Sequence, residues 1–298
     1  MALRMLTVIS HDAGGAEILS SLVRRRALAC AFVLDGPALR VFERKLGAVR
    51  TMPLVEAMEQ ASEILCGTSW QSDLEFRAIG MARRRGIRSV AFLDHWVNYT
   101  DRFSRDGVTH LPDALWVGDA YAHELARRLF PDREVVELHN PYLEDILEQM
   151  AAMPQRAPSA VGLSVLYVCE PVAEHARLRH ADANFWGYTE FSALRYFLAN
   201  IAVLGTSVER VILRPHPSEH PDKYLGVAAE FDLPIETGGG KSLLEEVWTS
   251  DLVAGCESMA LVVALAAGKR VISCIPEGAR DCSLPHAGIE RLASLLKA

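Results

Sequence analysis

The sequence predicts an α/β fold made of two Rossmann-like β-α domains that face a cleft. Short apolar segments alternate with longer amphipathic ones along all 298 residues, a rhythm typical of parallel strands that helices cover on both faces. Residues 151–160 lose this rhythm and contain two prolines. A chain of this length fits two ordinary domains. We therefore expect an N-terminal domain over residues 1–150, a linker over 151–160 and a C-terminal domain over 161–298.

The apolar segments place the strands in order along the chain. In the first domain we expect strands at residues 6–10, 29–34, 63–66, 89–93, 114–117 and 135–138. Amphipathic stretches between them, such as 16–26 and 74–85, predict helices. In the second domain we expect strands at residues 163–169, 210–213, 233–235, 252–254 and 270–275. Ligands of open α/β sheets bind beyond the carboxyl ends of the strands, so the residues after each strand are the candidates for function.

Composition narrows the class of protein. The net charge is −7 and half of the residues are hydrophobic, which argues against a nucleic-acid-binding domain and against disorder. Six cysteines form no C-x-x-C pair, as is typical of reduced core residues in a cytoplasmic protein. No segment approaches the roughly 20 apolar residues of a membrane span. The arginine clusters at 24–26 and 83–85 suit either peripheral membrane contact or, more commonly, solvated helix ends.

The segment Arg-Pro-His-Pro follows the expected strand 210–213. Arg214 and His216 then lie at the carboxyl end of a strand, where Pro215 and Pro217 restrict the backbone on either side of the imidazole. Both side chains suit hydrogen bonds to a phosphate. The alternative is a proline-rich turn whose histidine is merely exposed.

A second element suited to an anion follows the strand 252–254. Ser258 is the expected N-cap of a helix that stops at Gly268, and a helix N-terminus attracts phosphate through its unpaired N–H groups. Capping alone is the alternative role for Ser258. Glu257 is either a surface residue or an acceptor for ribose hydroxyls.

The first β-α junction combines His11 and Asp12 with Gly14 and Gly15, where the backbone permits close approach of a ligand. A structural turn is the alternative. Because Asp35 follows the second strand, as a ribose-binding acid would, a dinucleotide-binding dehydrogenase is a minor alternative.

Further polar side chains follow other strands. Asp94 and His95 come directly after the strand 89–93, and either of them suits a general base. Asp94 is slightly favoured over Asp12 for this role. Trp96 and Tyr99 follow in the same loop, where aromatics either stack on a sugar or anchor the loop.

In the second domain Glu170 ends the strand 163–169, and we expect it to line the cleft together with Tyr188 and Glu190. The glycine-rich loop around Gly239 borders the same cleft; it lacks the first glycine of a Walker A motif, because Ile235 stands there. The sequence contains neither G-x-S-x-G nor H-E-x-x-H nor a zinc-type cysteine pair, and we expect no metal and no cofactor.

Two β-α domains, the Arg-Pro-His-Pro motif and the later Glu-Ser-Met turn together resemble glycosyltransferases of the GT-B fold. More narrowly, the motifs are similar to those of bacterial sialyltransferases, polysialyltransferases and Kdo-transferase-like proteins. In those families a His-Pro motif, matched here by His216 and Pro217, binds the donor phosphate, and a serine motif completes the CMP site. Ser258 matches one serine of that motif, and Glu257 stands in place of the other.

The resemblance implies an inverting, metal-independent transfer of sugar from a nucleotide-sugar donor, with CMP-sugars favoured, to a glycan or lipid-linked acceptor. Asp94 or Asp12 would deprotonate the acceptor, and Arg214, His216 and Ser258 would hold the departing nucleotide. A hydrolase or epimerase of the same fold, and a non-catalytic nucleotide-sugar-binding protein, are the alternatives. The oligomeric state leaves no trace in the sequence.

Overall fold

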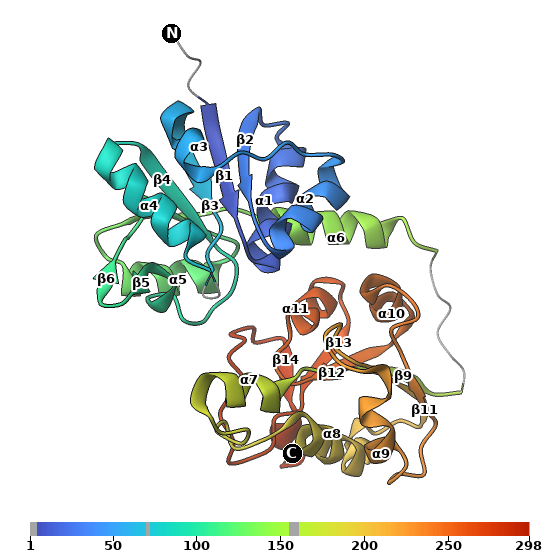
Figure 1. Cartoon of the computed structure of the whole chain (residues 1–298). Coiled ribbons are helices and arrows are strands. Elements are labelled where there is room, and N and C mark those ends of the chain that lie inside the picture. Colours follow the sequence, from blue (N-terminus) through green and yellow to red (C-terminus); the bar gives the residue numbers. More distant parts are fainter. Residues whose placement is uncertain (1–4, 70–71, 155–160, 298) are drawn as a thin grey trace. The chain divides into compact units, whose positions relative to one another are not determined.

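The computed structural model describes residues 5–69, 72–154 and 161–297. The chain forms two compact units, Met1–Asp145 and Ile146–Ala298 (Figure 1). Residues 155–160 of the predicted linker lie outside the described part of the chain.

Unit 1 is built on a parallel six-stranded sheet with the order β2-β1-β3-β4-β7-β8. Its strands are β1 (Met5–Ser10), β2 (Cys30–Leu34), β3 (Ala61–Cys66), β4 (Arg88–Leu93), β7 (Ala114–Val117) and β8 (Glu134–Glu137). Thr51 forms a single parallel bridge to Phe32 of β2, which marks the place of a further strand beyond β2. The chain therefore winds outward from β1 in one direction and then from β3 in the other, as in a Rossmann sheet.

Helices cover both faces of this sheet because the central strands are apolar on both sides. In β1, Val8 packs with α1 (Ala13–Arg25) and α2 (Pro37–Leu46). Its neighbour Ile9 points to the other face and packs with α3 (Leu54–Gln60), α4 (Leu74–Arg85) and α5 (Ala120–Leu129). A short hairpin, β5 (Ser104–Arg105) with β6 (Val108–Thr109), follows the 3-10 turn Asp101–Phe103.

Unit 2 repeats the architecture with the order β11-β10-β9-β12-β13-β14, all strands parallel. The strands are β9 (Leu163–Val168), β10 (Val208–Arg214), β11 (Ile235–Thr237), β12 (Leu252–Gly255), β13 (Arg270–Ser273) and β14 (Ile289–Arg291). Its helices are α7 (Val172–His180), α8 (Glu190–Ala199), α9 (Leu225–Ala228), α10 (Leu243–Thr249), α11 (Met259–Ala266) and α12 (Leu292–Leu295). The direction of winding reverses between β9 and β12.

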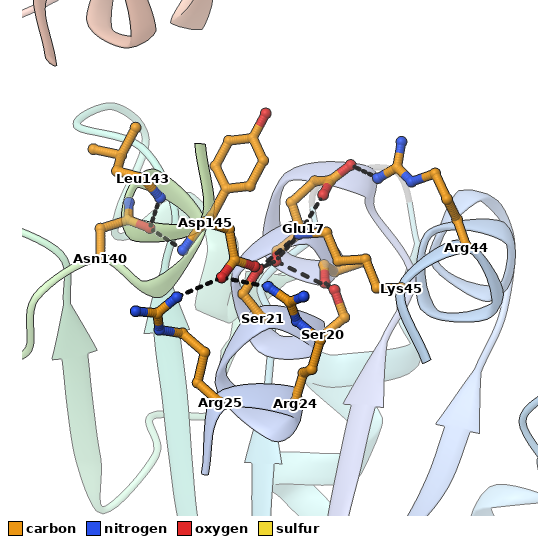
Figure 2. A network of polar contacts seen from close by, with 12 residues as sticks. Glu17, Ser20, Ser21, Arg24, Arg25, Arg44, Lys45, Asn140, Leu143 and Asp145 are labelled. Carbon is orange, nitrogen blue, oxygen red and sulfur yellow. Dashed lines mark hydrogen bonds and ion pairs between the residues drawn. The ribbon is translucent and has the colours of Figure 1, made fainter. Parts of the chain in front are cut away.

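Helix α6 (Pro141–Ala151) is tied to unit 1 through its first turn. Asp145 is 2% exposed and accepts from Arg24 at 2.6 Å and from Arg25 at 2.8 Å, both at the end of α1 (Figure 2). These contacts use two arginines of the cluster at 24–26 for packing within unit 1. The cluster at 83–85 ends α4 and is exposed. Within the described ranges, no helix has both the length and the apolar character needed to cross a bilayer.

The α/β class and the parallel sheets confirm the sequence prediction. Some details were wrong. The strand expected at 233–235 is β11, two residues later, and the three-residue strand β14 was missed because Ile-Glu-Arg carries no apolar run. The short strands β5 and β6 were missed as well. Helix α1 begins at Ala13, three residues before the expected start, because Gly14 and Gly15 are part of the helix. All six cysteines are free, as expected.

Candidate functional site

Each sheet has a point at its carboxyl edge where the winding direction reverses, and this is where ligands of such folds bind. In unit 1 the reversal lies between β1 and β3, so it brings together the residues that follow Ser10 and Cys66. In unit 2 it lies between β9 and β12, beside Glu170 and the turn before α11.

In unit 1 the β1–α1 turn holds a hydrogen-bonded histidine and aspartate. His11 Nδ1 lies 2.7 Å from Asp12 Oδ1, and the Ser69 hydroxyl donates to the same oxygen at 2.7 Å. The two side chains are 18% and 20% exposed. A Cβ at Gly36 would lie 2.6 Å from His11 Nε2, so only glycine leaves room at this nitrogen. The arrangement orients an imidazole through a carboxylate, as general-base pairs require.

Asp94, the base favoured from the sequence, directly follows β4 and pairs with an arginine. Arg102 Nη1 donates to Asp94 Oδ1 at 2.5 Å and to the Thr68 hydroxyl at 2.5 Å. The other carboxylate oxygen lies over Gly14, where a Cβ would approach within 2.2 Å. The Asp94 carboxyl thus lies between Arg102 and the N-terminus of α1 and is already paired with a cation.

The loop after Asp94 is anchored to the core of unit 1 through two aromatic side chains, Trp96 and Tyr99. Tyr99 is 2% exposed within the core, so the idea that it stacks on a sugar is wrong. Trp96 packs on the same core and donates from Nε1 to Asp119. His95 accepts the Trp96 N–H at 2.9 Å through Nδ1.

A buried glutamate that sequence reasoning missed stands behind the His11–Asp12 turn. Glu75, in the first turn of α4, is 3% exposed and accepts the His11 N–H at 2.7 Å. Burial, and then the charge of Asp12, raises the pKa of Glu75 from 4.5 to about 7, although the bond from His11 opposes the rise.

In unit 2 the turn before α11 already holds a carboxylate. Three successive N–H groups, of Cys256, Glu257 and Ser258, donate to Glu170 Oε1 at 3.1, 2.8 and 3.0 Å. The Ser258 hydroxyl caps α11 by accepting from the Ala260 N–H, so the predicted N-cap is confirmed. Burial and the charge of Glu257 raise the pKa of Glu170 to about 7 against these bonds. An anion fits at these three N–H groups, and the carboxyl group of Glu170 occupies the position.

The neighbouring polar residues are also paired. The Glu257 side chain binds Arg280 and accepts the Ser283 N–H at 3.0 Å. Arg214 Nη1 donates to Glu246 Oε2 at 2.6 Å, and Glu246 also accepts the Gly239 N–H at 2.6 Å. The glycine-rich loop is therefore fastened to the end of β10.

His216 is exposed and lies in the turn after β10. Its Nδ1 lies 2.7 Å from the Ser218 hydroxyl, and its N–H donates to Glu219 at 2.9 Å. Partial desolvation lowers the pKa of His216, so the imidazole is neutral at pH 7. Arg214 and Gly255 both pair with Val168 of β9, so His216 and Ser258 follow strands on opposite sides of β9 and share one edge of the sheet.

Two further residues expected to line the cleft have structural roles. Tyr188 is 1% exposed within a small apolar cluster. Glu190 is 4% exposed, accepts the Ala173 N–H and pairs with Lys223. Across the described residues no group of three or more histidine, cysteine or acidic side chains is placed to hold a metal ion.

No protein-family model matches the sequence, and no curated protein is similar to it. Solved structures are similar in fold. UDP-GlcNAc 2-epimerase from Methanocaldococcus jannaschii aligns with a TM-score of 0.58 at 11% identity, over 98% of this chain and 90% of the epimerase. A putative UDP-N-acetylglucosamine 2-epimerase from Listeria monocytogenes aligns with a TM-score of 0.56 at 11% identity, over 90% and 78%. The glycotransferase of kitacinnamycin aligns with a TM-score of 0.53 at 12% identity, over 98% and 87%. The chain thus has the two-unit α/β fold of the GT-B type.

Proposed function

We propose that this chain is a glycosyltransferase that uses a nucleotide-sugar donor and a hydroxyl acceptor, the acceptor bound by unit 1 and the donor by unit 2. The observation that carries the proposal is the His11–Asp12–Ser69 arrangement at the reversal point of unit 1, with both hydrogen bonds at 2.7 Å. The fold supports it because ligands of such sheets bind at this edge.

In the proposed reaction His11 is the general base. Its Nδ1–H donates to Asp12, so Nε2 carries the lone pair and takes the proton from the acceptor hydroxyl. The acceptor oxygen attacks the anomeric carbon while the bond from that carbon to the donor phosphate breaks, and its electron pair leaves with the phosphate. Asp12 stabilises the imidazolium that forms. The reaction inverts the anomeric centre and needs no metal.

The departing phosphate is assigned to the turn before α11. Three convergent N–H groups and the helix dipole favour an anion there, and His216 and Arg214 stand at the same edge. Because Glu170 accepts all three N–H groups, a phosphate has to take its place. CMP-sugars remain the favoured donors on the His-Pro and serine motifs, and a glycan or lipid-linked hydroxyl is the favoured acceptor.

A thermal-shift panel of CMP-, UDP- and GDP-sugars, with NAD as a comparison, tests donor binding, since a ligand at 100 times its Kd adds about 2.7 kcal/mol of stability. Turnover of the bound donor then tests the mechanism. His11→Gln should lower kcat about 100-fold or more. His123→Gln, in α5, is the control. Full turnover by His11→Gln refutes the assigned base, and binding of NAD alone refutes the donor class.

An epimerase that uses the same donors is the second candidate, supported by the two epimerase structures of similar fold. The two reactions differ in their products. An epimerase converts the sugar of the donor without an acceptor, whereas a transferase consumes donor at full rate only with one. Free sugar released at full rate without an acceptor identifies a hydrolase, and binding without any turnover identifies a non-catalytic nucleotide-sugar-binding protein.

A further inference from the structure

Glu75 connects the core of unit 1 to the base assigned above. It projects from the first turn of α4 into the β1–α1 turn and accepts the His11 N–H at 2.7 Å. At 3% exposure it is shielded from water. Its bond to the His11 peptide spans 64 residues of sequence, so the position of His11 depends on how α4 packs.

The second oxygen of this carboxyl is buried and accepts no hydrogen bond from the described residues. Glu75 Oε2 and the Ser10 hydroxyl are both buried, and neither has a hydrogen-bond partner among the described residues. A buried carboxylate is normally fully hydrogen-bonded, because an unpaired charge in the interior is costly. A carboxyl in this position therefore gains little stability for the fold.

The glycines around Glu75 make this close arrangement possible. A Cβ at Gly67 would lie 3.1 Å from the Ser10 hydroxyl and 3.8 Å from Glu75 Oε1. A Cβ at Gly15 would lie 3.1 Å from the Gly67 Cα. The β3 loop thus approaches α1 closely enough to enclose the carboxyl behind the histidine.

The titratable groups that face Glu75 come from two elements. Asp12, in the β1–α1 turn, disfavours its ionisation, whereas His11 favours it. The Cys66 thiol at the end of β3 is coupled to Glu75 but stays protonated, since burial raises the pKa of Cys66 well above its ordinary value. Asp12 and His11 therefore act in opposite directions on the pKa of Glu75.

We propose that Glu75 is a positioning residue for the His11–Asp12 pair: it holds the His11 peptide N–H and adds a second negative charge to the pair when it ionises. This role rests on the proposed function, because it assigns Glu75 to the base of that reaction. While protonated, Glu75 leaves Asp12 as the one anion of the pair. Its ionisation adds a negative charge next to the residue assigned as the base, so turnover should change with the charge of Glu75.

Three variants separate positioning from a purely structural role. Glu75→Gln keeps an oxygen for the His11 N–H and cannot ionise, whereas Glu75→Ala loses both properties. Glu56→Gln is the matched control, since Glu56 lies in the first turn of α3 and is exposed. Turnover is measured from pH 5.5 to 8.5 with the nucleotide sugar selected in the thermal-shift panel.

We expect Glu75→Ala to lose about tenfold or more in kcat with KM nearly unchanged, the factor that corresponds to a lost hydrogen bond to a buried N–H group. Glu75→Gln should restore most of kcat at pH 6 and lack the step near pH 7 that we expect in the wild-type curve. A wild-type pH curve in Glu75→Gln, or a Glu75→Ala variant as active as Glu56→Gln, overturns the proposal.

The proton shift of the His11 backbone amide, followed by NMR, needs no substrate. It should show a step near pH 7 in the wild type, caused by Glu75, that is missing from the curve of Glu75→Gln, and identical titrations overturn the proposal. Absence of turnover with every nucleotide sugar overturns the proposed function and, with it, the positioning role. The amide titration then still decides whether the Glu75 charge reaches His11.

Discussion

Substitution of Glu75 by glutamine should change how the stability of unit 1 depends on pH. Burial raises the pKa of Glu75 from 4.5 to about 7 in the folded chain, so the folded state binds a proton that the unfolded state has already lost between these values. Stability therefore falls as the pH rises through this range. The pKa difference of about 2.5 corresponds to about 3 kcal/mol, at 1.36 kcal/mol for each pKa unit. Glutamine carries no proton to lose, so the variant lacks this fall.

Urea titrations at pH 4.5, 6 and 8 measure the effect, with amide signals of β1 as reporters of unit 1. All other titratable groups are present in both proteins, so the difference between variant and wild type isolates Glu75. We expect Glu75→Gln to gain stability relative to the wild type by about 3 kcal/mol between pH 4.5 and pH 8. A difference that stays constant with pH would refute the reasoning, because it would place the folded pKa of Glu75 near its unfolded value.

Three further substitutions test other parts of the structure. Glu170→Gln removes the charge that a phosphate would have to replace, so the affinity for inorganic phosphate should rise, as measured by NMR from the Ser258 amide signal. A lower affinity would show that Glu170 stabilises the turn instead. Gly14→Ala forces a methyl group against the Asp94 carboxylate and should cost about 1–3 kcal/mol in urea unfolding, whereas the control Gly226→Ala, with no heavy atom within 4 Å of the new Cβ, should be neutral or slightly stabilising. Asp145→Asn should cost about 1.5–3 kcal/mol at pH 7 and less at pH 2. Burial raises the pKa of Asp145, but hydrogen bonds from Ser21, Arg25 and Arg24 outweigh it and lower the pKa, so the contribution of the carboxylate is lost as the pH falls through the lowered value; an equal cost at both pH values contradicts this.

The strands were predictable because each central strand of a parallel sheet is apolar on both faces, and this leaves a short apolar run in the sequence. The same rule located His11, Asp12, Asp94 and Glu170 at strand ends. Ser69 also lies shortly after a strand, three residues beyond β3. Nothing in the sequence, however, marks that serine as a partner of Asp12.

Other parts of the site left no local signal. Glu75 stands in the first turn of a helix, where an acidic residue usually interacts with the helix dipole, and its partner His11 is 64 residues away. Arg102 follows a loop without periodicity. Glu75 contacts His11, and Arg102 pairs with Asp94. Both contacts bear on which of the two is the base in the proposed reaction, and only the fold creates them.

The charges at the carboxyl edge of unit 2 indicate what a phosphate would have to displace there, if the proposed donor binds at this edge. The described edge of unit 2 is neutralised by the chain itself, since Glu246 pairs with Arg214 and Glu170 fills the turn before α11. A phosphate that enters gains three N–H groups only if a carboxylate gives them up, and a displaced carboxylate must either reach water or take up a proton. Because the pKa of Glu170 is near 7, protonation is inexpensive at neutral pH. Phosphate affinity should therefore weaken above pH 7 in the wild type more steeply than in Glu170→Gln, where the exchange releases no charge.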